Sequence, residues 1–187
     1  MKKLLLIFLA GLFFTLSVVA QSAVPVLDKS PMDMATYPAG YGLLKLQGKT
    51  TDPLAARVIY SRPLKNNRAI FGDLVAYNKV WRFGANENTE IEFFNDVTIN
   101  NTKVKKGKYS IFAIPDTGKW TIIINKDLNS WGAYKYEQTK DVLRVDVPLQ
   151  TSTEIADAFY IYFDKIKNGF ALNAGWDNVK ITLPVSM

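Results

Sequence analysis

Short segments in which polar and apolar residues alternate recur along the chain. Thr89-Glu90-Ile91-Glu92-Phe93 alternates residue by residue, and positions 142–147 do the same until Pro148. Successive side chains of a β-strand point to opposite faces, so this pattern predicts half-buried strands. The run 120–125 is continuous and β-branched, which indicates a central strand. Further strands are expected at 43–46, 56–60, 97–99, 108–114, 158–163, 170–174 and 178–183.

Turn signals separate these strands. Lys105-Lys106-Gly107 is typical of a hairpin link, and 175–177 is either a turn or the edge of a strand. No helical pattern reaches four turns, and only 70–80 has apolar residues at helical spacing. About nine such strands predict an all-β fold: a single antiparallel β-sandwich or jelly-roll-like domain, with at most one short helix near residues 70–80.

The first 20 residues have the pattern of a secretory signal peptide. Lys2 and Lys3 precede an almost wholly apolar run, 4–20, which ends in small residues before Gln21. A retained membrane anchor is the alternative, although the run is at the lower limit for spanning. We expect cleavage, then an extended N-terminal arm over 21–41 and the β-sandwich domain over 42–187. The mature protein would be periplasmic or extracellular, with no transmembrane anchor.

The chain has no cysteine and no histidine among its 187 residues. This composition excludes disulfides, thiolate or imidazole catalysis, and the zinc, haem and iron–sulfur sites that depend on those ligands. No cofactor and no metal site is therefore expected. The net charge falls from +6 to +4 once Lys2 and Lys3 are removed. The remaining lysines alternate with acidic residues, so nucleic acid is not an expected partner.

Polar and aromatic residues are densest between Tyr60 and Glu90. This segment is too long for a tight hairpin loop, and long ordered loops on a β scaffold often carry function. Arginine recognises carboxylate, phosphate or sulfate groups through paired donors. The candidate ligand-binding residues here are Arg62, Arg68, Trp81, Arg82, Asn86 and Glu87. The alternative is structural: the arginines would pair with Asp73, Glu87 and Glu90, and Trp81 would belong to the core.

A second aromatic segment follows the strand expected at 120–125. Trp131 and Tyr134 would present rings with polar tips, as in sugar- and peptide-binding sites. A packed loop, with its hydroxyl groups hydrogen-bonded inside the protein, is the alternative interpretation.

Several longer motifs occur in an order that resembles a known bacterial family. Tyr60-Ser61-Arg62-Pro63 is followed by Ile70-Phe71-Gly72, by Trp81-Arg82-Phe83-Gly84-Ala85-Asn86-Glu87, and later by Trp131-Gly132-Ala133-Tyr134. On these motifs the chain is similar to the exported proteins grouped as domain of unknown function 2911. The resemblance covers most of the chain after Gly40. It implies an envelope protein of the kind common in Bacteroidota, with one β-rich domain and no established reaction. Phe83 stands where the family usually has threonine, so a ligand that used this hydroxyl would lose it here.

The favoured hypothesis is a non-catalytic binding module for an anionic or polyhydroxylated ligand, either a small molecule or a glycan. The residues expected to converge on one concave face are Arg62, Arg68, Trp81, Arg82, Asn86, Glu87, Trp131 and Tyr134. One alternative is a carboxylate-based hydrolase of envelope glycans, with Glu87 as the acid beside a second carboxylate. The other is a structural or assembly component with an envelope protein partner, which would show an apolar patch around Tyr160 and Tyr162.

Overall fold

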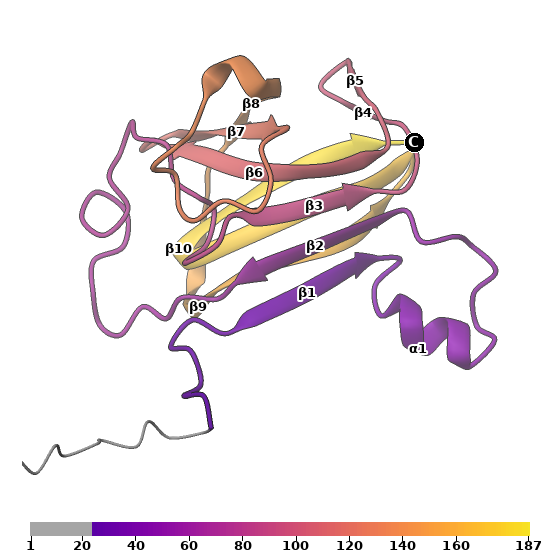
Figure 1. Ribbon diagram of the computed structural model, residues 1–187, viewed down its shortest axis with the longest axis horizontal. Helices are drawn as coiled ribbons and strands as arrows, with labels where there is room; N and C mark the ends of the chain where they lie inside the picture. The colour runs from indigo at the N-terminus through magenta and orange to yellow at the C-terminus, as the bar shows by residue number, and fades with distance from the viewer. Residues whose placement is uncertain (1–23) are drawn as a thin grey trace, which may run out of the picture.

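The alternating segments form two antiparallel sheets in the computed structural model, which describes residues 24–187 (Figure 1). The larger sheet has the order β1 (Met32–Tyr37), β2 (Ala56–Ser61), β3 (Thr89–Phe93), β6 (Gly107–Pro115), β7 (Lys119–Asn125), β8 (Asp141–Pro148). The smaller sheet has the order β5 (Thr102–Val104), β4 (Val97–Ile99), β10 (Gly169–Ser186), β9 (Gln150–Ile166). The all-β sandwich prediction is confirmed. A short helix, α1 (Tyr41–Leu46), and a 3-10 turn, η1 (Gln138–Lys140), complete the described elements.

The N-terminal region differs in part from its expected description. The expected signal peptide, 1–20, lies outside the described residues. No helix within residues 24–187 is long and apolar enough to cross a membrane. Residues 32–37, expected in the extended arm, form β1 and pair with β2 from Met32↔Ser61 to Tyr37↔Ala56. This part of the arm is therefore an edge strand of the larger sheet.

The alternation of apolar and polar residues along the strands places the core between the two sheets. In β3, Ile91 and Phe93 are buried, whereas Glu90 and Glu92 are partly exposed. β7 lies between β6 and β8 and buries an unbroken run of isoleucines, as the central-strand prediction requires. Burying one such side chain contributes about 1.5–3 kcal/mol of transfer free energy. Packing of the two inner faces therefore stabilises this cysteine-free domain.

The strand predicted at 43–46 is wrong, because Tyr41–Leu46 forms α1. Short apolar runs do not distinguish a strand from a helix by pattern alone. Here β1 and β2 pair directly with each other, starting at Tyr37↔Ala56. The residues between them have no sheet partner, and α1 satisfies part of their backbone through local hydrogen bonds, such as Gln47 N–H to the Leu43 carbonyl at 3.0 Å.

The short helix expected near 70–80 is also wrong. Gly72 and Asn78 have positive φ angles of 92° and 58°, which lie outside the right-handed helical region. Backbone hydrogen bonds instead join Gly72 N–H to the Val75 carbonyl and Val75 N–H to the Ile70 carbonyl. Ile70 and Val75 are buried. The apolar residues whose spacing suggested a helix therefore anchor a compact loop to the core.

β10 doubles back on itself near Asp177, whose φ is 57°. The Thr182 hydroxyl donates to the side-chain oxygen of Asn173 at 2.8 Å. Nine residues of extended chain span about 30 Å, so this contact requires the two halves of Gly169–Ser186 to lie side by side. The chain thus reverses near Asp177, while Gly175 and Asp177 also pair with Tyr160 and Ala156 of β9. Both interpretations that the sequence left open, a turn and a strand edge, therefore apply to this segment.

Asn100 and Asn101 connect β4 to β5 in a two-residue hairpin. Both have positive φ, 45° and 62°, as a type I′ turn requires. The link at 105–107 was expected to join the strand at 97–99 directly to the strand at 108–114. Instead β5 intervenes and pairs with β4, so 105–107 connects one sheet to the other.

Asp96 supports this connection between the sheets. Its carboxylate accepts the backbone N–H of Lys106 and the ammonium group of Lys105, each at 3.0 Å. The hydrogen bond from Lys106, followed by that from Lys105, lowers the pKa of Asp96 to about 2.

Asp96→Asn is expected to reduce the dependence of stability on acid pH. A carboxyl group with a depressed folded-state pKa stabilises the protein above its ordinary value of 3.8, and this contribution is lost as the pH falls towards 2. The variant should be slightly less stable than the parent near neutral pH, and the difference should disappear below about pH 2. Urea midpoints across this range measure the effect, with Glu154→Gln as an exposed control. An equal loss at every pH would contradict the prediction.

Candidate functional site

Two long loops meet at one end of the sandwich, away from α1 and the C-terminus (Figure 1). The first, 62–88, joins β2 to β3, and the second, 126–140, joins β7 to β8. Glu87 and Trp131 form an isolated antiparallel bridge, and Gly132 N–H donates to the Asn86 carbonyl at 2.9 Å. Backbone hydrogen bonds thus hold together two segments that lie more than forty residues apart in the sequence.

Asp127 and Lys140 anchor the base of the second loop. The Lys140 ammonium group lies 2.8 Å from carboxylate oxygens of both Asp127 and Glu137. The hydrogen bond to Asp127, followed by that to Glu137, raises the pKa of Lys140 to about 12, and the bond from Lys140 lowers the pKa of Asp127. Both groups are therefore ionised at neutral pH. From this base Trp131 and Tyr134 project into solvent, 58% and 83% exposed.

An aromatic cluster in the core lies beneath the first loop. Trp81 is 8% exposed, and its ring centroid lies 5.8 Å from Trp120, 6.3 Å from Trp176 and 5.3 Å from Phe159. Its indole N–H donates to the Gly84 carbonyl at 3.1 Å. Trp81 is therefore mainly a core side chain, and only a small part of its surface faces outward.

A pocket of about 220 Å³, which we call the arginine pocket, opens over this cluster. Its polar lining comes from Arg68, Arg82 and Asn86 of the first loop and from Ser30 of the N-terminal segment. The other lining residues are Pro63, Leu74, Val75, Trp81, Gly84, Ala85 and Trp176. Arg68, Trp81, Arg82 and Asn86, four of the residues singled out from the sequence, thus border one hollow.

An adjoining pocket of about 310 Å³, which we call the tyrosine pocket, adds Tyr134 and Lys79. It shares four lining residues with the arginine pocket: Leu74, Val75, Trp81 and Arg82. Gly132 has a φ of 68°, and a Cβ there would lie 2.8 Å from the Tyr134 ring and 3.7 Å from Arg82 Nη1. Glycine therefore allows Tyr134 to lie close to the backbone beside Arg82, which borders both pockets.

The cations of these pockets form no ion pair within residues 24–187. Arg68 donates to the carbonyls of Leu64 and Lys65, which satisfy N–H groups but do not neutralise its charge. Arg82 Nε is buried and has no hydrogen-bond partner among residues 24–187, and a buried unsatisfied group costs about 1–3 kcal/mol. No aspartate or glutamate lines either pocket. The site therefore has positive charge and an unmet donor.

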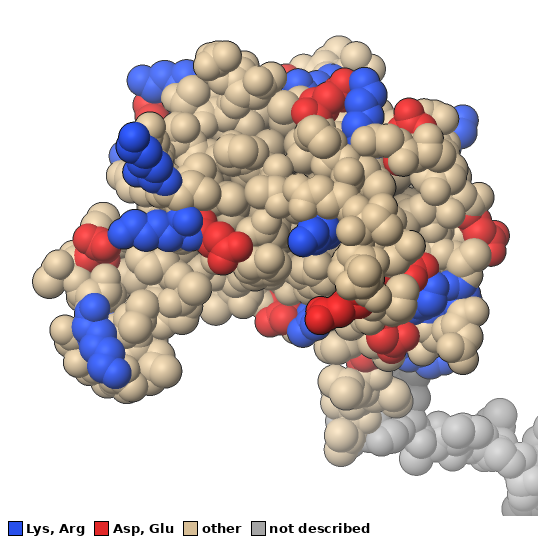
Figure 2. Space-filling model, turned by 180° about the vertical axis from the view of Figure 1, so that it is seen from behind, with Lys and Arg blue, Asp and Glu red and all other residues tan. Residues whose placement is uncertain are grey.

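Elsewhere on the surface, some basic groups lie beside acidic groups. Lys65 pairs with Asp177, and Lys119 pairs with Asp146. Figure 2 shows both signs dispersed over one face of the molecule, several times as adjacent pairs. Other lysines of residues 24–187, such as Lys126 and Lys180, also form no ion pair. The two pockets therefore differ from the rest of this surface in the buried Nε of Arg82 rather than in unpaired charge alone.

The N-terminal segment brings Asp28 to the rim of the arginine pocket. Its carboxylate accepts the side-chain amide of Asn86 at 3.0 Å and the Ser30 N–H at 2.6 Å. Asn86 and Ser30 both line the pocket. The neutral donors Asn86 and Ser30 at this rim thus bind the carboxylate of Asp28.

The remaining predicted site residues lie outside the pocket linings. Arg62 pairs with Asp33 of β1 at 3.0 Å and donates to the Phe159 carbonyl at 3.1 Å. Glu87 and Trp131 are exposed and bridge to each other through their backbones. The expected structural pairs are also not formed: the ion pairs of residues 24–187 join none of the three candidate arginines to Asp73, Glu87 or Glu90.

Glu87, the acid of the alternative hydrolase hypothesis, is exposed and lines neither pocket. That chemistry uses two carboxyl groups about 5–10 Å apart around a substrate. Glu87 is exposed rather than recessed, and neither pocket is lined by a carboxylate. Residues 24–187 also contain no group of three or more acidic side chains placed to hold a metal ion. Among residues 24–187, the two pockets are thus lined by cations and by no carboxylate.

One residue of the family motif lies outside the pockets, and two pocket residues lie outside the motifs. Phe83, where threonine was expected, is fully buried against Trp81 and Phe159 and lines neither pocket. A hydroxyl at this position would face the core. Lys79 and Ser30 do line the pockets, but they belong to no motif and no periodic pattern, so nothing in the sequence pointed to them.

Comparison with known proteins identifies one family. The model of the family described as "Protein of unknown function (DUF2911)" matches residues 45–185. No curated protein and no solved structure gives a significant match. The matched range includes both loops and every residue of the tyrosine pocket, whereas Asp28 and β1 precede it.

Proposed function

We propose that this chain, which belongs to the DUF2911 family, is an exported envelope protein that binds a small anionic ligand without breaking bonds in it. The site is the arginine pocket together with the tyrosine pocket. The observation that carries the proposal is the Nε of Arg82, which is buried and has no hydrogen-bond partner among residues 24–187. Arg82 borders both pockets. Their lining contains the three cations Arg68, Lys79 and Arg82 and no acidic residue.

The ligand class follows from the donors. A guanidinium group binds carboxylate or phosphate oxygens through parallel N–H groups. Asn86 in the arginine pocket and Tyr134 in the tyrosine pocket add neutral polar groups, which suit hydroxyl groups of the same ligand. We therefore favour a carboxylate- or phosphate-bearing sugar or a similar polyhydroxylated anion. The amino-terminal pattern of the sequence supports export.

Arg82→Gln is expected to weaken binding of such an anion by about 10- to 100-fold, because charged hydrogen bonds contribute about 1.5–3 kcal/mol each. The probes are glucuronate, glucose and inorganic phosphate, each titrated into the protein and followed by NMR of the arginine side-chain N–H signals. Glucuronate and phosphate should shift the Arg82 Nε–H signal. Glucose, which lacks the carboxylate, should bind more weakly than glucuronate.

Arg144→Gln is the matched control, because Arg144 pairs with Asp141 away from both pockets. It should leave the affinity for glucuronate within twofold of the parent. Arg82→Lys keeps the charge but not the paired donors, so it should restore only part of the binding. Equal affinities for glucuronate and glucose, or equal losses in Arg82→Gln and Arg144→Gln, would refute an anion site at Arg82.

A further inference from the structure

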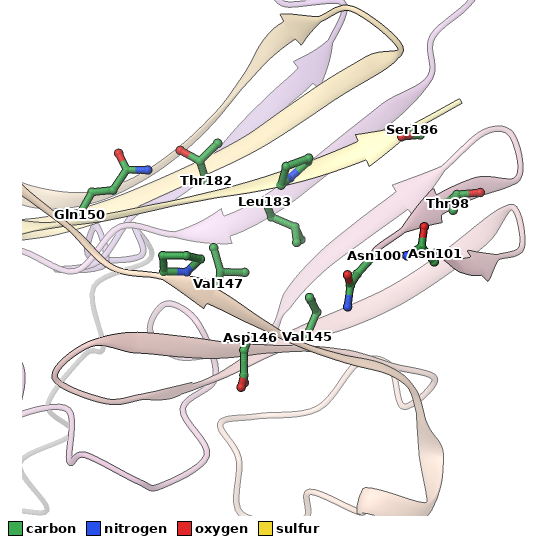
Figure 3. A pocket seen from close by; sticks show the side chains of 12 residues that line it. Thr98, Asn100, Asn101, Val145, Asp146, Val147, Gln150, Thr182, Leu183 and Ser186 are labelled. Carbon is green, nitrogen blue, oxygen red and sulfur yellow. The ribbon is translucent and has the colours of Figure 1, made fainter.

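A larger cleft, of about 600 Å³, lies between β8 and the C-terminal half of β10 (Figure 3). We call it the strand cleft. The turn residues Asn100 and Asn101 lie at one end and Gln150 lies at the other. It shares no lining residue with the arginine pocket or the tyrosine pocket. The function proposed above therefore does not use it.

The path of the strands creates this cleft. β10 pairs with β9 at Lys180↔Gln150 and with β4 at Ser186↔Thr98. Residues 181–185, between these two points, pair with neither strand. On the opposite wall, β8 is the last strand of the larger sheet and, in the part of the chain that the structure describes, pairs only with β7. Two strand edges thus face the cleft where a neighbouring strand would otherwise lie.

The free edge of β8 provides backbone donors and acceptors. In an antiparallel pair, alternate residues direct both N–H and C=O away from the partner strand. Residues 144–147 of β8 contain no proline, whereas Pro184 on the β10 wall has no N–H. β8 is therefore the wall that can form a continuous ladder. An extended peptide binds such an edge by adding a strand.

The side chains of the cleft are almost all uncharged. Val145, Val147 and Leu183 point into the space between the strands, whereas Asp146 points away and pairs with Lys119 (Figure 3). The polar rim consists of Thr98, Asn100, Asn101, Gln150, Thr182 and Ser186. An ionised group placed here would lose hydration without gaining a partner. No aromatic ring lines the cleft, so it lacks the stacking surface that sugars use.

We infer that the strand cleft binds an extended, uncharged peptide segment, which adds to β8 as a further strand. Backbone hydrogen bonds to residues 144–147 hold the segment. Its alternate side chains are small and apolar where they face Val145, Val147 and Leu183. The others are polar and meet the amide and hydroxyl rim.

A pool of capped heptapeptides made of serine, threonine, asparagine, valine and leucine tests this inference by NMR titration. Binding should shift the amide signals of 144–147 and slow solvent exchange of those amides whose N–H groups face away from β7. N-methylation of alternate residues in the tightest-binding peptide should abolish binding in one register and preserve it in the other, because only one set of N–H groups faces β8. Substituting two of its residues by lysine or glutamate should weaken binding at least about tenfold.

Two threonine variants provide the matched comparison. Thr98→Arg introduces a long cation into the cleft and should raise the dissociation constant for the peptide at least about tenfold. Thr153→Arg alters an exposed residue of β9 outside the cleft and should leave it within twofold. Arg82→Gln should leave peptide binding unchanged, which separates this inference from the anion site.

Three results would overturn the inference. The first is the absence of peptide-induced shifts at 144–147. The second is equal binding of the two N-methylated peptides, since the edge of β8 would then not supply the hydrogen bonds. The third is a concentration-dependent dimer that protects the same amides without peptide, because a second copy would then occupy the edge.

Discussion

Trp81→Ala is expected to lower the free energy of unfolding by about 3–5 kcal/mol, the range for truncating a buried aromatic side chain. The Trp81 ring centroid lies 5.8 Å from Trp120, 6.3 Å from Trp176 and 5.3 Å from Phe159. The substitution also removes the donor that satisfies the Gly84 carbonyl. Small domains are stable by about 5–15 kcal/mol, so this single change would remove a large part of the stability.

Urea denaturation followed by circular dichroism measures the effect. Trp131→Ala is the control, because Trp131 is 58% exposed and such surface changes cost within about 0.5 kcal/mol. Trp81→Phe keeps a ring without the indole N–H and should fall between the two. Similar losses in Trp81→Ala and Trp131→Ala would show that Trp81 does not stabilise the core.

Gly169→Ala is expected to be the second most damaging change. Gly169 has a φ of 145°, and a Cβ there would lie 2.1 Å from the Val185 carbonyl oxygen and 3.0 Å from the Ser186 Cα. Unfavourable φ costs about 1–3 kcal/mol, and forced overpacking costs another 1–3 kcal/mol or so. The expected loss is therefore roughly 2–6 kcal/mol.

Gly118→Ala is the matched control for this prediction. A Cβ at Gly118 would meet no atom within 4 Å, and its φ is not positive. Thermal or urea unfolding of the two variants compares them directly, and Gly118→Ala should change stability by no more than about 0.5 kcal/mol. If Gly169→Ala proved equally mild, the two halves of β10 could not lie against each other as Thr182 and Asn173 indicate.

One residue in an uncommon backbone conformation, Phe83, lies in the chain between Arg82 and Gly84, which line the arginine pocket. Phe83 and Asn86 have φ angles of 55° and 57°, and a positive φ is uncommon for a bulky residue such as phenylalanine. Burial of Phe83 and the backbone bond between Asn86 and Gly132 hold these conformations. Arg82, with its unmet donor, lies beside them. Strain and unsatisfied polar groups tend to collect where proteins bind ligands, which agrees with the proposed site.

Local sequence patterns predicted most of the strands, but they predicted few of the strand pairings within the sheets. The alternation of 89–93 and 142–147 depends only on the two-residue repeat of a strand, so β3 and β8 could be predicted. The run 43–46 lacked such a repeat, and whether it became strand or helix depended on the direct pairing of β1 with β2. The compact loop at 70–80 likewise follows from burial of Ile70 and Val75 in a core built by distant strands.

The candidate site was likewise predictable from the sequence only in part. Arginine chemistry and the family motif pointed to Arg68, Trp81, Arg82 and Asn86, which line one pocket. The same reasoning pointed to Arg62, but Asp33, 29 residues earlier in the chain, pairs with it. No motif distinguishes an arginine that has an acidic partner from one that has none.

The amino-acid sequence alone determined the chemistry open to this protein and the faces of its strands, because composition and the two-residue repeat are properties of the chain itself. Tertiary structure decided which cations stay unpaired around Arg82, and it opened the gap between β8 and β10. Both depend on contacts between segments far apart in the chain. Such contacts are chosen by the packing of the whole fold, and no local pattern encodes them.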